Sequence, residues 1–189
     1  THPTLAIPEL MRILLDECGY GWEQAWHIVT NTFAYTNHTV MAEALEKWDQ
    51  SLVEKILPRI YSIICEINRR YCEDLFNRTQ DSDRVSKMSI IQGGKIHMAY
   101  LCCAASHSVN GVSKLHSQII KDDVFRLQYL DRPSQFKNVT NGIAYRRWLL
   151  QSNHGLTDLL SQCIGEGFKK DAAELIKFQV FANDKNVLE

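Results

Sequence analysis

Residues 136–150 read F-K-N-V-T-N-G-I-A-Y-R-R-W-L-L, and this stretch decides how the chain is organised. It places an Asn-Gly pair between a polar, strand-like run and an Arg-Arg-Trp helix start. Gly142 can adopt a positive φ, so we expect the backbone to turn sharply there. The amide of Asn141 donates and accepts hydrogen bonds at once, which suits a hydroxyl-rich ligand such as a sugar. A turn that binds no ligand is the alternative for an isolated Asn-Gly pair.

Composition and charge argue against several classes of protein. The chain has 189 residues, enough for one ordinary domain, and its hydrophobic share of 45% is usual for a globular protein. Its 21 basic and 22 acidic side chains give a net charge of −1, so we expect no nucleic-acid partner. No apolar run is long enough to cross a bilayer, and the chain opens without a leader peptide. We therefore expect a cytoplasmic protein with no membrane partner.

The cysteine and histidine spacings do not indicate a metal site. None of the six cysteines forms a C-x-x-C pair, and we expect buried, reduced thiols of a cytosolic protein. The interval between His107 and His116 is not a recognised spacing of metal ligands, so structural hydrogen bonding is the better interpretation of both. We predict no metal site.

Helical periodicity dominates the chain, and strand signals are sparse. An apolar stripe from Leu5 to Leu14 predicts a first helix, and two glycines at positions 19 and 21 end it. Pro58 should kink or divide a long helical region over residues 52–76. Further helices are predicted over residues 22–32, 98–106, 113–121, 124–130, 147–151, 156–164 and 171–182, the last of them amphipathic. The strand signal lies at 89–91 and 138–140, a turn at 92–94, and the best candidate for a mobile loop at 77–86.

Seven further blocks, in this order and spacing, carry a family resemblance. They are T-H-P-T-L-A-I-P-E-L-M-R (1–12), F-A-Y-T-N-H-T-V (33–40), E-A-L-E-K-W (43–48), L-P-R-I (57–60), E-I-N-R-R (66–70), S-H-S-V-N-G-V (106–112) and L-H-S-Q-I-I-K (115–121). Together with residues 136–150 they resemble the middle of the α-glucan phosphorylases, the family of glycogen, starch and maltodextrin phosphorylases. The resemblance extends from Thr1 to about Phe168.

The resemblance implies a fold. The family has two Rossmann-like domains of the GT-B glycosyltransferase type, which face each other across a deep cleft. Residues 1–140 then correspond to the C-terminal part of the first domain, and residues 141–189 to the start of the second, cofactor-binding domain. Because most central strands belong to other parts of such a protein, we expect a mostly α fragment of an α/β parent, with few strands. Thr1 lies inside a recognisable block, so we expect a piece of a longer protein.

The resemblance also implies an activity for the intact parent. The family transfers the terminal α-1,4-linked glucose of glycogen, starch or maltodextrin to inorganic phosphate, which gives α-D-glucose 1-phosphate with retention. Its cofactor is pyridoxal 5′-phosphate on a lysine, and the enzyme is typically a homodimer. In the family that lysine and the phosphate-binding residues lie beyond the position of Glu189. We therefore expect no catalytic or cofactor-binding residue in this chain, and no phosphorolysis by the chain alone.

Four residues match the family's glucose site. His38, in N-H-T, matches a histidine that contacts the glucose 6-hydroxyl, and Asn141, in T-N-G-I, matches an asparagine at the same hydroxyl. Val109, in S-V-N-G, matches a residue that lines the glucose pocket. His2, in T-H-P, falls in a block beside the pocket on the anomeric side. On spacing alone, a structural role would be the better interpretation of His38.

Two departures from the family pattern bear on the junction. Ala42 replaces a proline of P-E-A-L-E-x-W, and Ala144-Tyr145 replace Thr-Pro in T-N-G-I-T-P-R-R-W-L. The second change removes a proline that stiffens the crossing between domains. We expect Arg146 and Arg147 to tie this junction together through carboxylates, and Trp148 to be core. A non-catalytic helical interaction segment of a phosphorylase homologue is the alternative function.

Overall fold

The computed structural model describes the backbone of residues 2–188 and the side chains of residues 3–188. The chain forms two compact units, Thr1–Asn141 and Gly142–Glu189, so the division falls inside the stretch 136–150. The expectation of a mostly helical chain with few strands is confirmed. The assignment of the two units to two domains of a larger enzyme stays a prediction.

The first unit begins with the helices that the apolar stripe predicts. A 3-10 turn (His2–Leu5) leads into α1 (Ala6–Arg12), which continues as a π-helical segment (Ile13–Glu17). Gly19, with a φ of 71°, takes the left-handed conformation that favours glycine and follows the end of this segment. The next helix, α2 (Trp22–Thr32), has the bounds that its periodicity predicts.

Pro58 divides the long helical region, as predicted. Helix α3 (Gln50–Ile56) stops one residue short of it, and α4 (Pro58–Thr79) begins at the proline. A proline is tolerated at the first helical position because the N–H that it lacks would have no partner in the helix. One apolar face of α4 is buried along about four turns, through Ile60, Ile63, Ile64, Ile67, Tyr71 and Leu75.

The prediction of a mobile loop over residues 77–86 is wrong. Helix α4 continues to Thr79, and Gln80 then turns the chain with a left-handed φ of 54°. The Asp81 carboxylate accepts a 2.9 Å hydrogen bond from the Arg84 N–H, which caps α5 (Ser82–Met88). The polar composition of the segment thus reflects a capped helix-to-helix turn, because aspartate satisfies the free N–H groups of a helix start.

A three-stranded parallel sheet lies in the first unit. It has the order β1-β5-β6, with β1 at Ala34–Thr36, β5 at Ser108–Gly111 and β6 at Phe136–Asn138. Val109 in the central strand lies opposite Tyr35 on one side and Phe136 on the other. All three strands therefore end at the same edge of the sheet.

A second sheet is antiparallel, with the order β2-β4-β3. Its strands are β2 (Lys47–Asp49), β3 (Ile91–Gln92) and β4 (Lys95–His97), and a 3-10 turn (Ala42–Ala44) precedes β2. Two glycines at 93 and 94, with φ of 55° and 75°, form the predicted turn between β3 and β4. Within residues 2–188 the sequence prediction overlaps β3 and β6 but misses β1, β2, β4 and β5.

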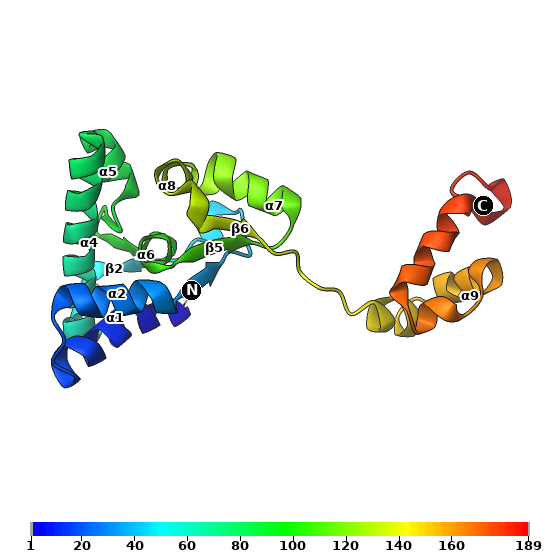
Figure 1. Cartoon of the computed structure of the whole chain (residues 1–189), viewed down its shortest axis with the longest axis horizontal. Helices are drawn as coiled ribbons and strands as arrows, with labels where there is room; N and C mark the ends of the chain where they lie inside the picture. The colour runs from blue at the N-terminus through cyan, green and yellow to red at the C-terminus, as the bar shows by residue number, and fades with distance from the viewer. Residues whose placement is uncertain (1, 189) are drawn as a thin grey trace. The chain divides into compact units, whose positions relative to one another are not determined.

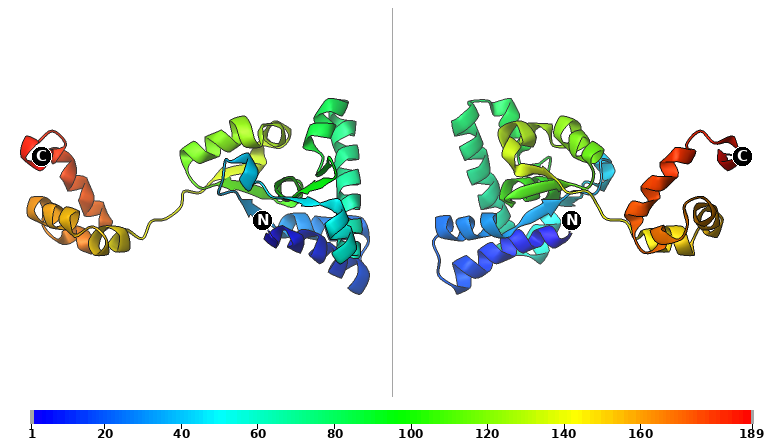
Figure 2. Two further views of the ribbon diagram at one scale, coloured as in Figure 1. Left: turned by 180° about the vertical axis from the view of Figure 1, so that it is seen from behind. Right: turned by 45° about the vertical axis from the view of Figure 1, so that its right-hand side comes forward.

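Helices cover the parallel sheet from both sides. Helix α6 (Met98–Ala105) is followed by β5, and then by α7 (Lys114–Ile119), a π-helical segment (Ile120–Val124), α8 (Arg126–Asp131) and a 3-10 turn (Pro133–Gln135). Figures 1 and 2 show α7 and α8 on one side of the sheet, and α1 and α2 on the other. The predicted helices at 98–106, 113–121 and 124–130 are confirmed, with shifted ends.

Two apolar clusters hold the first unit together. The larger joins α1, α2, α4 and α6, and it includes Met11, Ile64 and Leu101, all 0% exposed. The smaller cluster lies against the parallel sheet, where Phe125 and Phe136 contact Val109 and its neighbours. Burial of large apolar side chains on this scale is the main favourable contribution to folding.

The described cysteines are all free, but only two of them are buried. Cys102 and Cys103 lie inside the first unit, whereas Cys18 is exposed and the other three are half-buried. Burial raises the pKa of the Cys102 and Cys103 thiols. The expectation of uniformly buried thiols is therefore wrong for the remaining four.

The second unit is a small helical assembly. It contains a π-helical segment (Arg146–Gln151), α9 (His154–Ile164), two 3-10 segments (Gly167–Lys169 and Ala172–Phe181) and α10 (Lys185–Leu188). The Asn153 side chain caps α9, and the side chains of Thr157, Leu160 and Phe168 are buried. The helical predictions at 147–151, 156–164 and 171–182 are confirmed in position.

Three expectations for the second unit are wrong in detail. Trp148 is 61% exposed instead of core, and Ile176 and Val180 in the last predicted amphipathic helix are 73% and 80% exposed. Arg146 donates to the backbone carbonyls of Lys169 and Lys170, at 3.3 and 2.7 Å, instead of to a carboxylate. Across the described residues no helix is long and apolar enough to cross a membrane.

Candidate functional site

The carboxyl ends of the parallel strands bring together two of the residues that sequence analysis singled out, His38 and Asn141. Asn37 and His38 follow β1, Val112 follows β5, and Val139 to Asn141 follow β6. In open α/β sheets, ligands bind outside the carboxyl ends of parallel strands, because loops from several strands meet there. This edge is therefore the candidate site.

The loop after β1 fixes the backbone of His38 and leaves its ring exposed. The buried Asn37 donates its N–H to Asn110 O at 2.9 Å, which extends the strand pairing by one residue. Its Oδ1 accepts from the Thr39 N–H at 3.0 Å and so closes a local turn around His38. Within residues 3–188 the His38 ring has no hydrogen-bond partner, so both nitrogens are available to a ligand.

The segment after β6 presents Asn141 in the same way. Val139 donates its N–H to Gly111 O at 3.2 Å, and Asn141 donates its N–H to Val112 O at 2.9 Å. The Asn141 side chain is exposed and makes no hydrogen bond to the described part of the chain. The structure thus places His38 and Asn141 at one sheet edge, in the segments that follow the two strands flanking β5.

Gly142 does not behave as the sequence predicts. It is not among the described glycines with positive φ, and a Cβ there would meet nothing within 4 Å. The sharp turn expected beside the Asn141 amide is therefore wrong. The hydrogen bond to Val112 fixes the Asn141 backbone instead.

Val109 lies in the core. Its side chain is 0% exposed and belongs to the cluster around Phe125 and Phe136, so it supports the sheet from within. Val112, which is half-exposed, occupies the strand end between the two predicted sugar-binding residues. The signal that could have found it is Gly111, since a glycine that closes a short strand marks the following residue as the first of the edge loop.

Two further predicted residues give a different outcome. The backbone of His2 opens the first 3-10 turn, but its side chain lies outside the described residues, so its role stays a prediction. His107 is exposed at the amino end of β5, and its ring has no hydrogen-bond partner among residues 3–188. Structural hydrogen bonding is therefore wrong for the His107 ring, whereas it is confirmed for His116.

His116 contacts two of the loops at the edge. Its Nδ1 lies 3.1 Å from the Val112 N–H, and its Nε2 lies 3.1 Å from Asn37 Oδ1. The Ser113 hydroxyl caps α7 and accepts from the His116 N–H at 3.0 Å, which holds the first helical turn beside the strands. Sequence reasoning assigned a structural role to this histidine but not its partners.

Close packing of α7 explains Gly111. A Cβ on Gly111 would lie 2.4 Å from Ser117 Oγ and 2.7 Å from Ser117 Cα, so any side chain would displace the helix. Ser117 Oγ in turn donates to Asn138 Oδ1 at 2.7 Å. The first turns of α7 therefore bind the ends of all three strands: β1 through Asn37, β5 through Val112 and β6 through Asn138.

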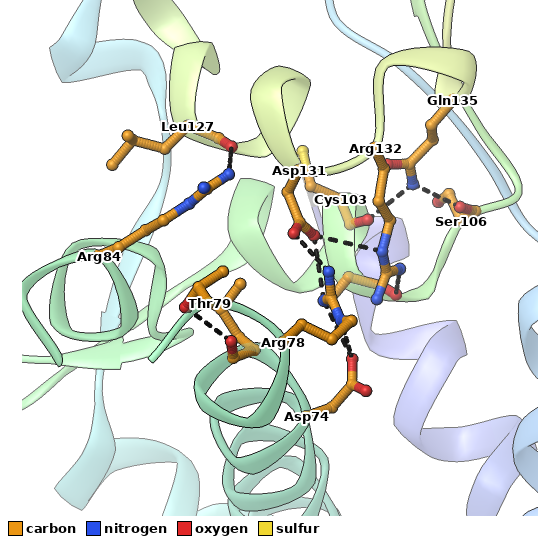
Figure 3. A network of polar contacts seen from close by, with 12 residues as sticks. Asp74, Arg78, Thr79, Arg84, Cys103, Ser106, Leu127, Asp131, Arg132 and Gln135 are labelled. Atoms are coloured by element: carbon orange, nitrogen blue, oxygen red, sulfur yellow. Dashed lines mark hydrogen bonds and ion pairs between the residues drawn. The ribbon is translucent and has the colours of Figure 1, made fainter. Parts of the chain in front are cut away.

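A polar network around the side chains of Asp131 and Gln135 connects helices of the first unit, before the amino ends of β5 and β6 (Figure 3). The Asp131 side chain, 4% exposed, forms ion pairs with Arg78 at 2.6 Å and Arg132 at 3.5 Å. Gln135 Nε2 donates to the carbonyls of Cys103 and Ser106, at 2.7 and 2.6 Å. The ion pair raises the pKa of Arg78, and the network ties α4, α6 and α8 together.

Two cavities of the first unit lie beside its helices, and the second reaches Thr36 at the carboxyl end of β1. One of about 470 Å³ is lined by Trp22, Trp26, Tyr71 and their neighbours between α2 and α4. Another, of about 390 Å³, lies between the first helix and β1. Neither of these two cavities is lined by His38 or Asn141, whose side chains are exposed. No group of His, Cys, Asp and Glu among the described residues could hold a metal ion.

Comparisons with known proteins place the chain. The family model of the carbohydrate phosphorylases matches residues 1–189. Glycogen phosphorylase of Bacillus subtilis (strain 168) is 47% identical over 190 residues, which cover 100% of this chain and 24% of that protein. The liver form of Bos taurus is 50% identical over 188 residues, or 97% of this chain and 22% of that protein. The muscle form of Bos taurus is 45% identical over 196 residues, or 100% and 23%.

The chain spans about a quarter of the length of these relatives. The match covers both compact units, including residues 169–189, for which sequence analysis gave no resemblance. The chain belongs to the carbohydrate phosphorylase family.

Proposed function

We propose that this chain is the central segment of an α-glucan phosphorylase. The intact enzyme would transfer the terminal α-1,4-linked glucose of glycogen, starch or maltodextrin to inorganic phosphate and release α-D-glucose 1-phosphate with retention. The names of the relatives support this activity, since each of those given above is a glycogen phosphorylase. The two-domain GT-B fold and a homodimer belong to the same proposal.

The observation that carries the proposal is the common edge that His38 and Asn141 share. Both side chains are exposed and have no hydrogen-bond partner among the described residues. Their backbones are held: Asn37, next to His38, donates its N–H to Asn110 O, and Asn141 donates its own N–H to Val112 O. Fixed backbones with free polar side chains are what a site needs in order to recognise a hydroxyl group. The proposed ligand group is the 6-hydroxyl of glucose.

In this proposal the two side chains act by positioning. An imidazole nitrogen of His38 and the carboxamide of Asn141 can together donate to and accept from one hydroxyl. Their grip on the hydroxymethyl arm orients the ring, and the anomeric carbon is brought to the reacting groups without being touched by either residue. Val112, at the end of β5 between them, forms the wall of this subsite in place of the buried Val109.

In this proposal, residues outside this chain hold the cofactor. Pyridoxal 5′-phosphate would supply a phosphate group that gives and takes a proton. A lysine that holds it as a Schiff base must be enclosed, and every lysine among residues 3–188 is exposed or half-exposed. The described residues therefore do not fit the cofactor, and the role of this chain is confined to the sugar.

Turnover by the full-length enzyme tests the proposal. Glucose 1-phosphate should form from glycogen, starch or maltodextrin only when inorganic phosphate is present. Asn141→Ala should lower kcat/KM about 5- to 150-fold, because a hydroxyl left without its partner costs about 1–3 kcal/mol. Cofactor content should not change. Asn183→Ala, at another exposed asparagine whose side chain has no described partner, is the matched control.

Two outcomes would contradict the proposal. Cofactor loss with preserved kinetics in Asn141→Ala would remove the assigned sugar contact. A full-length protein that releases no glucose 1-phosphate under any of these conditions would favour the non-catalytic interaction segment.

A further inference from the structure

Helix α7 links the two predicted sugar-binding loops through one side chain. His116 lies in the first turn of α7, and its ring contacts Asn37 and Val112. Asn37 precedes His38, and the Val112 carbonyl accepts a hydrogen bond from the Asn141 N–H. We propose that His116 is a positioning residue, which holds His38 and Asn141 in register so that both reach the same hydroxyl. This inference rests on the proposed function of the site.

The hydrogen bonds admit one tautomer of His116. The Val112 N–H can only donate, so Nδ1 must accept with its lone pair at 3.1 Å. The ring proton is then on Nε2, which donates to Asn37 Oδ1 at 3.1 Å. Asn37 Oδ1 also accepts from the Thr39 N–H, and Asn37 Nδ2 donates to the Tyr35 hydroxyl at 3.0 Å, which fixes the orientation of that amide.

A short chain of bonds therefore runs from each sugar-binding residue to the imidazole. On the β6 side it passes from the Asn141 N–H to Val112 O, and from the Val112 N–H to His116. On the β1 side it passes from His116 to Asn37, which adjoins His38 in the sequence. Asn37 is only 1% exposed, so water cannot easily replace the imidazole as its partner.

Loss of His116 should alter the spacing of the loops without removing a ligand contact. The half-buried ring is occupied on both nitrogens and has none left for a sugar. Its effect on turnover must then pass through the positions of His38 and Asn141. This predicts a defect that depends on the 6-hydroxyl of the substrate, because a small misplacement weakens an oriented contact strongly.

The test compares glucose 1-phosphate with 6-deoxyglucose 1-phosphate as donors for chain elongation by the full-length enzyme. His116→Ala should lower kcat/KM for glucose 1-phosphate by about 5- to 100-fold, and for the deoxy sugar by less than about twofold. His116→Gln can still accept and donate, so it should restore part of the loss. The control is His107→Ala, at the amino end of β5, whose ring has no hydrogen-bond partner among residues 3–188. This variant should change neither kcat/KM value.

Equal losses with both donors, or no loss, would overturn the inference. An Asn141→Ala arm separates this failure from that of the proposed function, because that variant must itself discriminate between the two donors if Asn141 binds the 6-hydroxyl. The tautomer gives an independent measurement in protein labelled with ¹⁵N-histidine. Nuclear magnetic resonance should find Nδ1 of His116 unprotonated and Nε2 protonated, and the reverse assignment would also overturn the inference.

Discussion

Gly111→Ala should be the most destabilising small substitution at the strand ends. The added Cβ would lie 2.4 Å from Ser117 Oγ, 2.7 Å from Ser117 Cα and 3.0 Å from Ser117 Cβ. A rotation of the hydroxyl can relieve the first contact, but the second is with backbone, so α7 itself must move. That shift also breaks the 2.7 Å bond from Ser117 to Asn138.

The magnitude follows from these two effects. Overpacking of this kind costs about 1–3 kcal/mol, and loss of the hydrogen bond adds about 1 kcal/mol. We expect the free energy of unfolding to fall by about 2–4 kcal/mol, which is a large part of the stability of an ordinary domain. Urea unfolding of the 189-residue chain, followed by far-ultraviolet circular dichroism, measures the change.

Gly21→Ala is the matched control. Gly21 precedes α2 with an ordinary φ of −69°, and a Cβ there meets nothing within 4 Å. Its substitution should cost less than about 1 kcal/mol, the cost of a weaker N-cap. A double variant, Gly111→Ala with Ser117→Gly, should recover part of the loss, since it removes two of the three close atoms. Equal stability of Gly111→Ala and Gly21→Ala would refute the reasoning.

Three further predictions concern the buried aspartate and the buried thiols. Asp131→Ala should lower the free energy of unfolding by about 1–3 kcal/mol, because it leaves Arg78 and Arg132 without their buried partner. The control, Glu73→Ala, removes an exposed ion pair and should cost less than about 1 kcal/mol. Equal effects of the two substitutions in urea titrations would contradict this prediction. Cys18 should react with iodoacetamide at pH 8 well before Cys102 and Cys103, as read by mass spectrometry, since burial raises the pKa of the latter two. Because these pKa values are raised in the folded state, the free energy of unfolding should fall as the pH rises above the ordinary thiol pKa of about 8.5. Fast labelling of Cys103 in the native protein would contradict the interpretation.

Periodicity predicted the helices well because they bury a continuous apolar face. The spacing of Ile60, Ile64 and Ile67 in α4, and the proline at its start, are local signals that tertiary contacts only reinforce. The strands β1 and β5 were missed because they span three and four residues. Their pairing is created by contacts between distant segments, and two or three residues of alternation are too few to read.

The candidate site divides in the same way. Motifs predicted His38 and Asn141, and the structure places both at one edge of the sheet, while their contact with a sugar stays a prediction. Gly111 marks the position of Val112, but the contacts of Val112 and His116 could not be predicted, since they depend on where the strands end and on which backbone groups remain free. Gly142 shows the converse error: the Asn-Gly pair predicted a sharp turn, but Gly142 has no positive φ, and the preceding Asn141 is held by its N–H bond to Val112 O.

At the edge of the parallel sheet, the groups that hold the loops are different from the side chains that are free to bind a ligand. Main-chain groups, the buried side chains of Asn37 and Ser117 and the half-buried His116 ring hold the loops, whereas the side chains at positions 38 and 141 contribute no hydrogen bond to that framework. Those two positions can therefore be exchanged at little thermodynamic cost. If these positions bind the proposed sugar, the preference among sugars can change while the framework stays unaltered, so this edge of the sheet is open to evolutionary change.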